Sequence, residues 1–553
     1  MLDRAVIDSL FPADLPEPAD WERRYPPRQL PEGAAVTRFG PSPTGFVHIG
    51  GIYTATIDRD VATHSSGVYL LRVEDTDQAR EVAGALEQFA RAFAYFDLPP
   101  DEAEGHGAYG PYHQSAREQV YLTYVRELLR TGQAYPCFAT KEELAEITAR
   151  QQAAKLPTGY YGTWALWRDA APEDVAAKLA AGDAYVVRFR APELTAANAR
   201  VRFTDAIRGE LSHEANRNDA VILKSSDASP RLPTYHFAHA VDDHLMRVTL
   251  VIRGEEWISS VPLHQQLFAA LGHEPVTYAH IAPLMKQISG GKRKLSKRKD
   301  PEASVEHYIA AGYPSAAVQY YLRGLANGRL AELPLEQALT EPIRLDQCGV
   351  AGPLVDLVKL EDISADYIAA LPGEVVLAIV AEWAITYDRE LAEVLATEPD
   401  LALRALAVER EGVANPRKDL RKWSDFRSAY GFFFPQLFER LQGPSDARIG
   451  EASAVDVSAI SAFIGDLVAS YRHLDDPREW FDQIRAASVR NGFAASPKDY
   501  KADPDAYHGS IREASQLVRL AITGSTRSPD LHAVAQALGA DEVLGRLSVL
   551  AVA

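Results

Sequence analysis

The sequence contains very little cysteine. Of its 553 residues only two are cysteine, Cys137 and Cys348, and they lie far apart in the chain. Such a pair supplies neither a disulfide framework nor a Cys-x-x-Cys metal site. A small disulfide-stabilised secreted protein is therefore excluded, and we expect a cytoplasmic protein.

Long apolar segments are also missing. The longest uninterrupted apolar run, residues 375–381, is bounded by Glu374 and Glu382 and is too short to cross a bilayer. The first residues, MLDRAVIDSLFPADLPEP, lack the basic and apolar regions of a secretory signal. We therefore expect neither secretion nor a membrane partner.

Positive charge is in deficit, with 58 Lys and Arg against 76 Asp and Glu and a net charge of -18. Taken by itself, this balance argues against a nucleic-acid partner. Two local segments are nevertheless basic: residues 292–299 read KRKLSKRK, and residues 417–427 contain five basic side chains. An acidic protein with such patches can bind one polyanion in one orientation and repel it elsewhere.

The chain is organised around residues 38–77. A strand at 36–39 runs into a glycine-rich turn and a helix, and a second strand at 68–73 ends in the acidic residues 74–77. This is the layout of a nucleotide-binding half-sheet. Glycines at the start of a helix let backbone N–H groups approach a polyphosphate.

A second strand and helix follow at residues 246–252 and 262–271. We therefore predict that segments 34–115 and 231–304 form one sheet, split by an insertion. Beyond residue 305 the pattern is helical. There is no GxxxxGK[ST] and no Gly-x-Ser-x-Gly, which excludes a P-loop and a nucleophile elbow. What remains is a phosphate site that uses a histidine, backbone N–H groups and lysines.

Several ordered motifs resemble a known family. GPSPTGFVHIGG resembles the "HIGH" signature of class I aminoacyl-tRNA synthetases, and residues 294–298, KLSKR, resemble their "KMSKS" signature. The segments TRFGPSPTG, LRVEDTDQAR, PTYHFAHAVDDHLM, VIRGEEW and, near the C-terminus, VRLAITGSTRSPDL are similar to glutamyl-tRNA synthetases of the bacterial type. Ser42 and Thr44 stand where glutaminyl relatives tend to carry an acidic residue and an Asn. The resemblance covers most of the chain.

The resemblance implies an α/β fold: a split Rossmann-like class I catalytic domain with an insertion, followed by an all-α anticodon-binding region. The domains expected on this basis are an N-terminal extension of unknown role (1–33), the first catalytic half (34–115), an acceptor-stem-binding insertion (116–230), the second catalytic half with the KLSKR loop (231–304), a helical stem-contact connector (305–375) and an α-helical anticodon-binding domain (376–553).

The resemblance also implies the reaction, which is ATP-dependent ligation of L-glutamate to the 3′ end of tRNA(Glu) through a glutamyl-adenylate, with release of AMP and pyrophosphate. The attacking carboxylate is already ionised, so the protein must mainly position the reactants and stabilise spread negative charge. We expect ATP with Mg²⁺, a monomer, and activation that requires bound tRNA. Some relatives carry a Cys/His zinc cluster in the insertion, where this chain has only Cys137, so we expect no zinc. Whether tRNA(Gln) is a second acceptor stays open.

The residues that match the family positions fall into four groups. The catalytic group is His48, Lys294 and Lys297. The ATP-binding group is His48, Gly50, Gly51, Leu284, Met285, Lys294 and Lys297. The glutamate-binding group is Arg38, Gly40, Ser42, Glu74, Tyr235, His239, Arg253 and Trp257, and the expected anticodon contact is Arg417. Within the glutamate-binding group, we assign Arg253 to the α-carboxylate, and Arg38 with Tyr235 to the γ-carboxylate.

Simpler interpretations remain open for several of these residues. His48 could only cap backbone groups, Glu74 could form an ion pair with Arg72 or Arg38, and Trp257 could be core. His239 departs from the family, which often has an Asn there, and its charge would depend on pH. We expect Asp242 and Asp243 to be structural. The rival functions are an altered paralogue that charges a modified nucleoside or tRNA(Asp), and a non-catalytic tRNA-binding protein.

Overall fold

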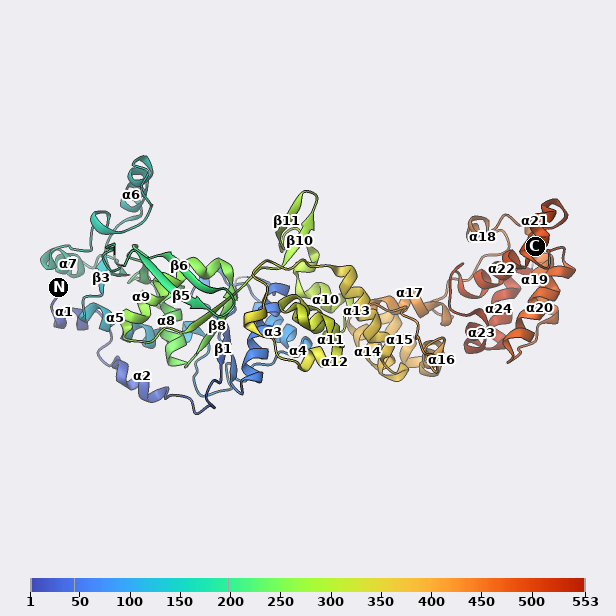
Figure 1. Ribbon diagram of the computed structural model, residues 1–553, viewed down its shortest axis with the longest axis horizontal. Coiled ribbons are helices and arrows are strands. Elements are labelled where there is room, and N and C mark those ends of the chain that lie inside the picture. Colours follow the sequence, from blue (N-terminus) through green and yellow to red (C-terminus); the bar gives the residue numbers. More distant parts are fainter. Residues whose placement is uncertain (1, 44, 197, 552–553) are drawn as a thin grey trace. The chain divides into compact units, whose positions relative to one another are not determined.

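The computed structural model describes residues 2–43, 45–196 and 198–551, so Thr44 lies outside the described residues. The chain divides into two compact units. Unit 1 comprises residues 1–307 and 318–356, and unit 2 comprises residues 308–317 and 357–553. Each unit is described separately, and Figure 1 labels their elements.

The centre of unit 1 is a mainly parallel arrangement of strands. Strand β1 (Val36–Phe39) pairs in parallel with β2 (Val68–Leu71). On the other side of β1 lies β8 (Leu250–Gly254), where the N–H of Thr249 donates to the carbonyl of Val36. The two predicted halves therefore meet side by side, as expected of a split Rossmann-like domain.

Beyond β8 the sheet continues into the predicted insertion. Its order is β8, β9 (Thr277–Ile281), β5 (Arg200–Asp205) and β6 (Gly209–Glu214). Strand β5 pairs in parallel with β9 at Asp205 and Tyr278, and it forms an antiparallel hairpin with β6. The segment between the halves thus contributes strands to the layer that carries the glutamate-pocket residues.

Three helices come directly before or after these strands in the chain. Helix α3 (Ile49–His64) follows β1, α8 (Tyr235–Leu245) precedes β8, and α9 (Val261–Leu271) follows it. Helix α9 has Pro262 in its first turn and ends at Gly272 in the left-handed conformation, as its sequence predicts. The strand predicted to begin at Met246 begins instead at Leu250, because Met246 is the C-cap of α8. Buried apolar residues in that tight connection imitate the start of a strand.

The rest of unit 1 contains the predicted insertion and its neighbours. The three-stranded sheet in the insertion is antiparallel in the order β3, β4, β7. The bounds are α4 (Ala85–Tyr95), α5 (Glu118–Arg130), β3 (Ala134–Cys137), α6 (Lys141–Ala153), α7 (Pro172–Ala180), β4 (Val186–Phe189), β7 (Val221–Leu223), β10 (Met285–Ile288), β11 (Gly291–Lys294) and α12 (Leu335–Thr340).

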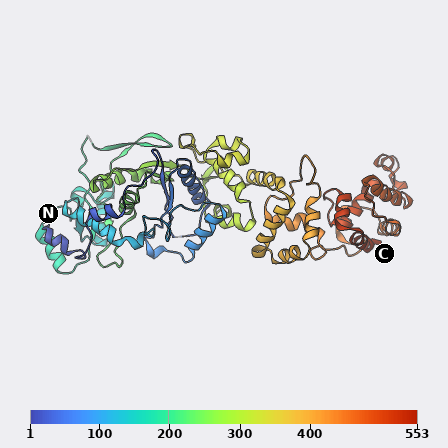
Figure 2. The same cartoon turned by 90° about the horizontal axis from the view of Figure 1, so that it is seen from below.

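The N-terminal extension is an integral part of unit 1. It contains α1 (Arg4–Ser9) and α2 (Pro18–Arg24). Trp21 is 6% exposed, and its indole N–H donates to the Thr123 hydroxyl of α5 at 3.0 Å. Arg28 forms a bidentate pair with Glu102, with both distances 2.8 Å. Figures 1 and 2 both place α1 next to α7, so the extension also contacts the insertion.

Unit 2 is helical throughout its described residues, which confirms the predicted all-α C-terminal region. Its core is built from buried side chains of α13 to α24, among them Leu391, Phe463 and Trp480. The bounds, with those of the two helices shared with unit 1, are α10 (Val305–Ala311), α11 (Ser315–Ala326), α13 (Leu357–Ala370), α14 (Gly373–Tyr387), α15 (Arg389–Thr397), α16 (Pro399–Ala407), α17 (Phe426–Tyr430), α18 (Ala447–Ala452), α19 (Val457–Ser470), α20 (Pro477–Arg490), α21 (Pro497–Ala502), α22 (Ile511–Thr523), α23 (Leu531–Leu538) and α24 (Ala540–Ala551). Among the residues described in both units, no helix has the length and apolarity needed to span a membrane.

The packing of the extension generates a stability prediction. Trp21→Ala removes a buried indole and its hydrogen bond, so we expect α5 to lose about 3 kcal/mol of local stability. Hydrogen exchange of the α5 amides measures this loss. Arg23→Ala is the control, because the Arg23 side chain is 71% exposed. Unchanged α5 protection in Trp21→Ala would show that the extension does not support the unit.

Candidate active site

A cavity of about 340 Å³ lies where the turn after β1 enters α3. Five of the seven predicted ATP-binding residues line it, together with Glu256 and the segment before β10. These five are His48, Gly50, Gly51, Leu284 and Lys294. Met285 is instead held by backbone hydrogen bonds with Pro353 and Val355, and the Nζ of Lys297 donates to the carbonyl of Phe46.

His48 is both a helix cap and a cavity residue. It is the N-cap of α3, and its Nδ1 accepts the N–H of Gly50 at 2.8 Å. Burial, together with the nearby Lys297 and Lys294, lowers the pKa of His48 to about 4. The ring is therefore neutral at pH 7, and because Nδ1 is an acceptor, its proton is on Nε2. The capping interpretation and the functional one are compatible.

The two predicted catalytic lysines lie on a braced loop. Lys294 ends the β10–β11 hairpin, which projects from the rest of unit 1 in Figure 1, and its Nζ lies 3.1 Å from Glu256. Asp300 accepts the N–H of Ser296 at 2.9 Å and pairs bidentately with Arg293 at 2.6 and 2.7 Å. The loop thus has a fixed base, while each amine is held by one group that a phosphate could replace.

The arginine side of the glutamate pocket is a buried charge network. Arg38, on β1, is 4% exposed, and its Nε lies 3.5 Å from Asp243. Arg72 pairs with the same Asp243 and, at 3.0 Å, with Glu74. The ion-pair interpretation of Glu74 is therefore realised with Arg72. The Glu74 carboxylate lies against Gly40, where an added Cβ would be 2.4 Å from it, so position 40 has no room for a side chain.

The acidic pair on α8 has the structural role that was predicted. Asp242 accepts hydrogen bonds at 2.7 Å from Arg117 and Tyr121. Burial alone would raise the pKa of Asp243, but Arg72, His239 and Arg38 hold it well below its usual range. The Asp243 carboxylate therefore stays ionised, and the two aspartates fix α8 to β1, to the residue after β2 and to α5.

The aromatic side of the pocket is built from α8 and the turn after β8. The Tyr235 and Trp257 rings lie 4.5 Å apart, and the Tyr235 hydroxyl lies 3.4 Å from Nη1 of Arg253. Tyr235 thus contacts Arg253, whereas the sequence-based assignment places Tyr235 with Arg38 at the γ-carboxylate. Ser42 is exposed on the turn after β1. Which arginine takes which carboxylate stays a prediction.

His239 lies one turn after Tyr235 and is fully buried. Its Nδ1 is 2.6 Å from Asp243, and its Nε2 is 2.9 Å from the Tyr278 hydroxyl. Burial lowers the pKa of His239 to about 4, although Asp243 opposes that shift. The imidazole is therefore neutral near pH 7 and can replace the amide of an Asn as a hydrogen-bonding group.

Sequence reasoning missed the residues that orient Arg253. Its Nε lies 3.1 Å from Nε2 of His280, and Nδ1 of His280 lies 2.6 Å from Asp205. His280 thus donates to Asp205 and accepts from Arg253. The Nη2 nitrogen of Arg253 lies 3.3 Å from Nδ1 of His264. The residues come from β5, β9 and α9, and no local motif connects them.

The predicted basic segment of unit 2 is largely neutralised. Arg417 pairs bidentately with Asp419, both distances 2.7 Å, and with Glu409 at 3.2 Å. The other four basic residues of 417–427 also have carboxylate partners: Lys418 with Asp366, Arg421 with Glu361, Lys422 with Asp425, and Arg427 with Asp388. Much of the local positive charge of this segment is therefore compensated, and its role in binding tRNA stays a prediction. Arg417 does line a cavity of about 710 Å³ with Phe432 and Arg527.

Metal ligands are sparse at the ATP cavity. Glu256 supplies the carboxylate among its lining residues, and within the described residues no group of three possible ligands gathers there. Cys137 is buried, with its Sγ 3.5 Å from the Tyr160 hydroxyl. A Mg²⁺ ion at this cavity would fit only as a complex held mainly by phosphate oxygens.

Comparisons with known proteins identify the family to which this chain belongs. Residues 34–351 match the family described as tRNA synthetases class I (E and Q), catalytic domain. The glutamate–tRNA ligase of Acetivibrio thermocellus is 40% identical, with 99% of both chains covered. The chain belongs to the glutamate–tRNA ligases.

Further matches agree with this family. Residues 509–551 match an anticodon binding domain. The glutamate–tRNA ligase of Clostridium perfringens (strain 13 / Type A) is 39% identical over 98% of this chain and 99% of its own. The crystal structure of a glutamate tRNA ligase from Elizabethkingia meningosepticum, in complex with its amino acid, aligns with a TM-score of 0.75 and 26% identity, covering 93% of this chain and 98% of that one.

The Arg253 contacts generate a prediction for the ligase reaction. Without the His280 acceptor, the Arg253 guanidinium can rotate, so we expect His280→Phe and Asp205→Asn each to raise KM for glutamate about 10-fold. The effect on kcat should be smaller. His106→Gln, at an exposed position, is the control. In an Arg253→Lys background Asp205→Asn should add little, and full additivity there would contradict the argument.

Proposed function

We propose that this chain carries out the reaction of its family with the residues of the site described above. It ligates L-glutamate to the 3′ end of tRNA(Glu) through a glutamyl-adenylate, using ATP and releasing AMP and pyrophosphate. The observation that carries the residue assignment is the convergence on one cavity of a neutral His48, the glycines that begin α3, and Lys294. Those groups suit a triphosphate.

In the first step the α-carboxylate of glutamate attacks the α-phosphorus of ATP. The new bond joins that carboxylate oxygen to phosphorus, and the bond to the bridging oxygen of pyrophosphate breaks. His48 donates its Nε2–H to a phosphate oxygen, and Lys294 and Lys297 leave Glu256 and the Phe46 carbonyl to stabilise the added negative charge. Bound Mg²⁺ would neutralise part of the triphosphate charge.

The glutamate-binding roles rest on the buried charge network. Arg253 holds the α-carboxylate, since His280 fixes its orientation through Nε, while its terminal nitrogens have only long contacts of 3.3–3.5 Å that a carboxylate could replace. Arg38 holds the γ-carboxylate, because Asp243 and Glu74 keep this buried guanidinium protonated. Ser42 and Glu74 face the amino group, while Gly40, Tyr235, His239 and Trp257 form the walls.

In the second step a hydroxyl of the terminal tRNA ribose attacks the acyl carbon, and AMP leaves. We assign the acceptor end to residues 116–230, the adjoining stem to 305–375, and the anticodon to 376–553, where Arg417 faces a cavity with an aromatic ring. The enzyme acts as a monomer, and the insertion, residues 116–230, holds no zinc cluster. As a translation enzyme it belongs in the cytoplasm.

Pyrophosphate exchange tests the enzyme assignment. The chain should exchange pyrophosphate into ATP only with glutamate and tRNA(Glu) both present. His48→Ala should reduce this rate about 10²–10³-fold, because it removes one donor to developing charge. His48→Gln should retain part of the rate, since its amide can still donate. Absence of glutamate-dependent exchange with and without tRNA would refute the assignment and favour a tRNA-binding protein.

Charging assays on purified tRNA(Glu) and tRNA(Gln) test the partner assignment. We expect Arg417→Ala to lower kcat/KM for tRNA(Glu) about 10-fold, the result expected from losing one base contact. Its ratio between the two tRNAs should change as well. Arg389→Ala is the matched control, because that side chain is 90% exposed. An equal decrease for both tRNAs would indicate that Arg417 contacts only phosphate or supports the fold.

A further inference from the structure

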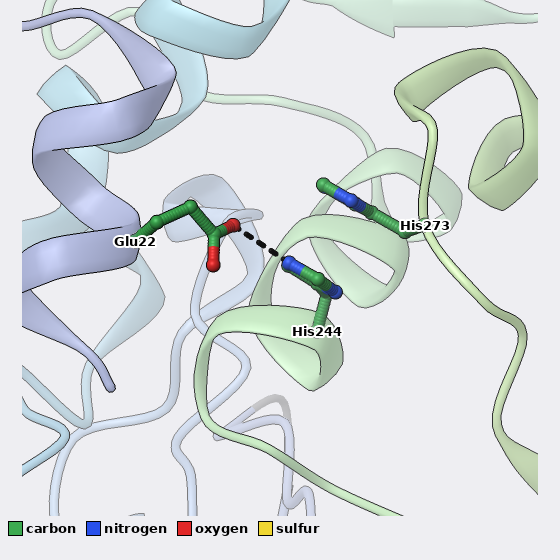
Figure 3. Close-up of side chains that lie close together, drawn as sticks. All are labelled: Glu22, His244 and His273. Carbon is green, nitrogen blue, oxygen red and sulfur yellow. Dashed lines mark hydrogen bonds and ion pairs between the residues drawn. The ribbon is translucent and has the colours of Figure 1, made fainter. Parts of the chain in front are cut away.

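Three potential metal ligands meet in unit 1 at a place that the ligase reaction does not use. Glu22 lies in α2, His244 lies in α8, and His273 directly follows Gly272, the residue that caps α9. Each offers one ligand atom, and these atoms lie within 4.8 Å of one another. Figure 3 shows the Glu22 carboxylate and the two imidazoles close together, with ribbons from three separate segments around them.

Both imidazoles are in the form that binds metals. Their rings are stacked, with centroids 3.4 Å apart and planes at 3°. Burial is the main cause that lowers both pKa values, that of His273 to about 4. Two neutral rings can stack in this way, whereas two imidazolium rings would repel. A metal ligand must be a neutral imidazole, so neither ring carries a positive charge that an ion would have to displace near pH 7, although the Nε2 proton of His244 must move to Nδ1.

One nitrogen of the group lacks a partner. Nε2 of His273 is inaccessible to solvent and has no hydrogen-bond partner among the described residues. A buried polar nitrogen without a partner is costly. The side chain is also not needed to fill an apolar core, because it stacks on another histidine and lies edge-on to Tyr124. A bound ion would satisfy this nitrogen.

The third donor is Oε1 of Glu22. Oε2 of Glu22 accepts from Arg247 at 2.7 Å, while Oε1 lies 2.7 Å from Nε2 of His244 and accepts a longer bond of 3.4 Å from the Tyr124 hydroxyl. The proton shared between Oε1 and Nε2 occupies the position that a cation would take. Arg247 offsets the charge of Glu22 and therefore weakens, without blocking, the attraction for a cation.

We propose that Glu22, His244 and His273 form a binding site for a divalent first-row transition-metal ion, of which Zn²⁺ is the representative. Two imidazoles and one carboxylate are a donor set that such ions favour, whereas Mg²⁺ and Ca²⁺ favour oxygen alone. The stacked rings present their in-plane lone pairs side by side. In the proposed complex one ring would rotate about its Cβ–Cγ bond, so that both lone pairs reach a single ion.

The ion would cross-link the N-terminal extension to the catalytic fold. Glu22 belongs to the extension, and His244 follows Asp243 on the helix that carries Tyr235 and His239. The site therefore gives the extension a role in stabilising the glutamate-pocket helix. This proposal is independent of the proposed function, since neither ATP nor glutamate takes part in it.

The experiment is titration of the untagged, metal-free full chain with ZnCl₂ by calorimetry, and with CoCl₂ by visible absorption. We expect one ion per chain at this site. His273→Phe and His244→Phe keep a ring in the stack but remove a donor, so each should weaken binding at least 10-fold. His106→Gln, an exposed histidine, is the control and should bind as the unaltered chain does.

A thermal measurement separates binding from misfolding. Zn²⁺ should raise the melting temperature of the unaltered chain by mass action, and it should not raise that of His273→Phe. Glu22→Gln provides a second variant with nearly unchanged shape, and it should also bind more weakly. The proposal is overturned if the unaltered chain binds no ion, or if His273→Phe and Glu22→Gln both bind Zn²⁺ as tightly as it does.

Discussion

Asp243 is the buried charge on which the proposed glutamate pocket depends. It pairs with Arg38 from β1, with Arg72 directly after β2 and with His239 from its own helix, and none of these four side chains is appreciably exposed. Removing one partner of a buried ion pair costs about 3–5 kcal/mol, because the other charge is left without compensation. The network therefore fixes the two halves of the catalytic domain to each other, and it sets the position of the Arg38 guanidinium.

The same principle explains how the inserted segment belongs to the site. Asp205 is part of β5, in the segment between the two halves, yet it sets the tautomer of His280 and so the direction of Arg253. Arg38 and Arg253 are thus each held by a separate buried charge network. The two networks meet at His264, which lies 3.3 Å from Arg253 and packs against His239. The proposed amino-acid pocket therefore depends on residues outside the motifs that can be found in the sequence.

Much of the fold and part of the site could be predicted from the sequence. The turn at residues 40–51 and the start of α3 follow from local glycines and from His48, whose capping and cavity positions depend on neighbouring residues. Longer-range features could not be predicted in this way. The pairing of Asp205 with His280 depends on strands 75 residues apart in the chain, and the start of β8 depends on how α8 ends.

Charge was misjudged for a similar reason. Residues 417–427 contain five basic side chains, but several of their partners, such as Asp366 and Asp388, are distant in sequence and cannot be found by counting local charges. The sequence allows Glu74 to form an ion pair with Arg72 or with Arg38, and the structure shows the pair with Arg72. A sequence therefore predicts which residues carry charge more reliably than it predicts which charges remain uncompensated.

The two lysines of the KLSKR loop are held by partners of different kinds, and this difference makes ATP entry asymmetric. When Lys297 leaves the carbonyl of Phe46, it leaves behind a neutral dipole that water can solvate. When Lys294 leaves Glu256, it exposes a carboxylate at the rim of a cavity about to receive four negative charges. The Glu256 carboxylate thus repels the nucleotide on one side of the cavity only, and a cation bound to the phosphates would remove this repulsion. In the proposed reaction, the free enzyme would therefore disfavour a triphosphate that arrives without a cation.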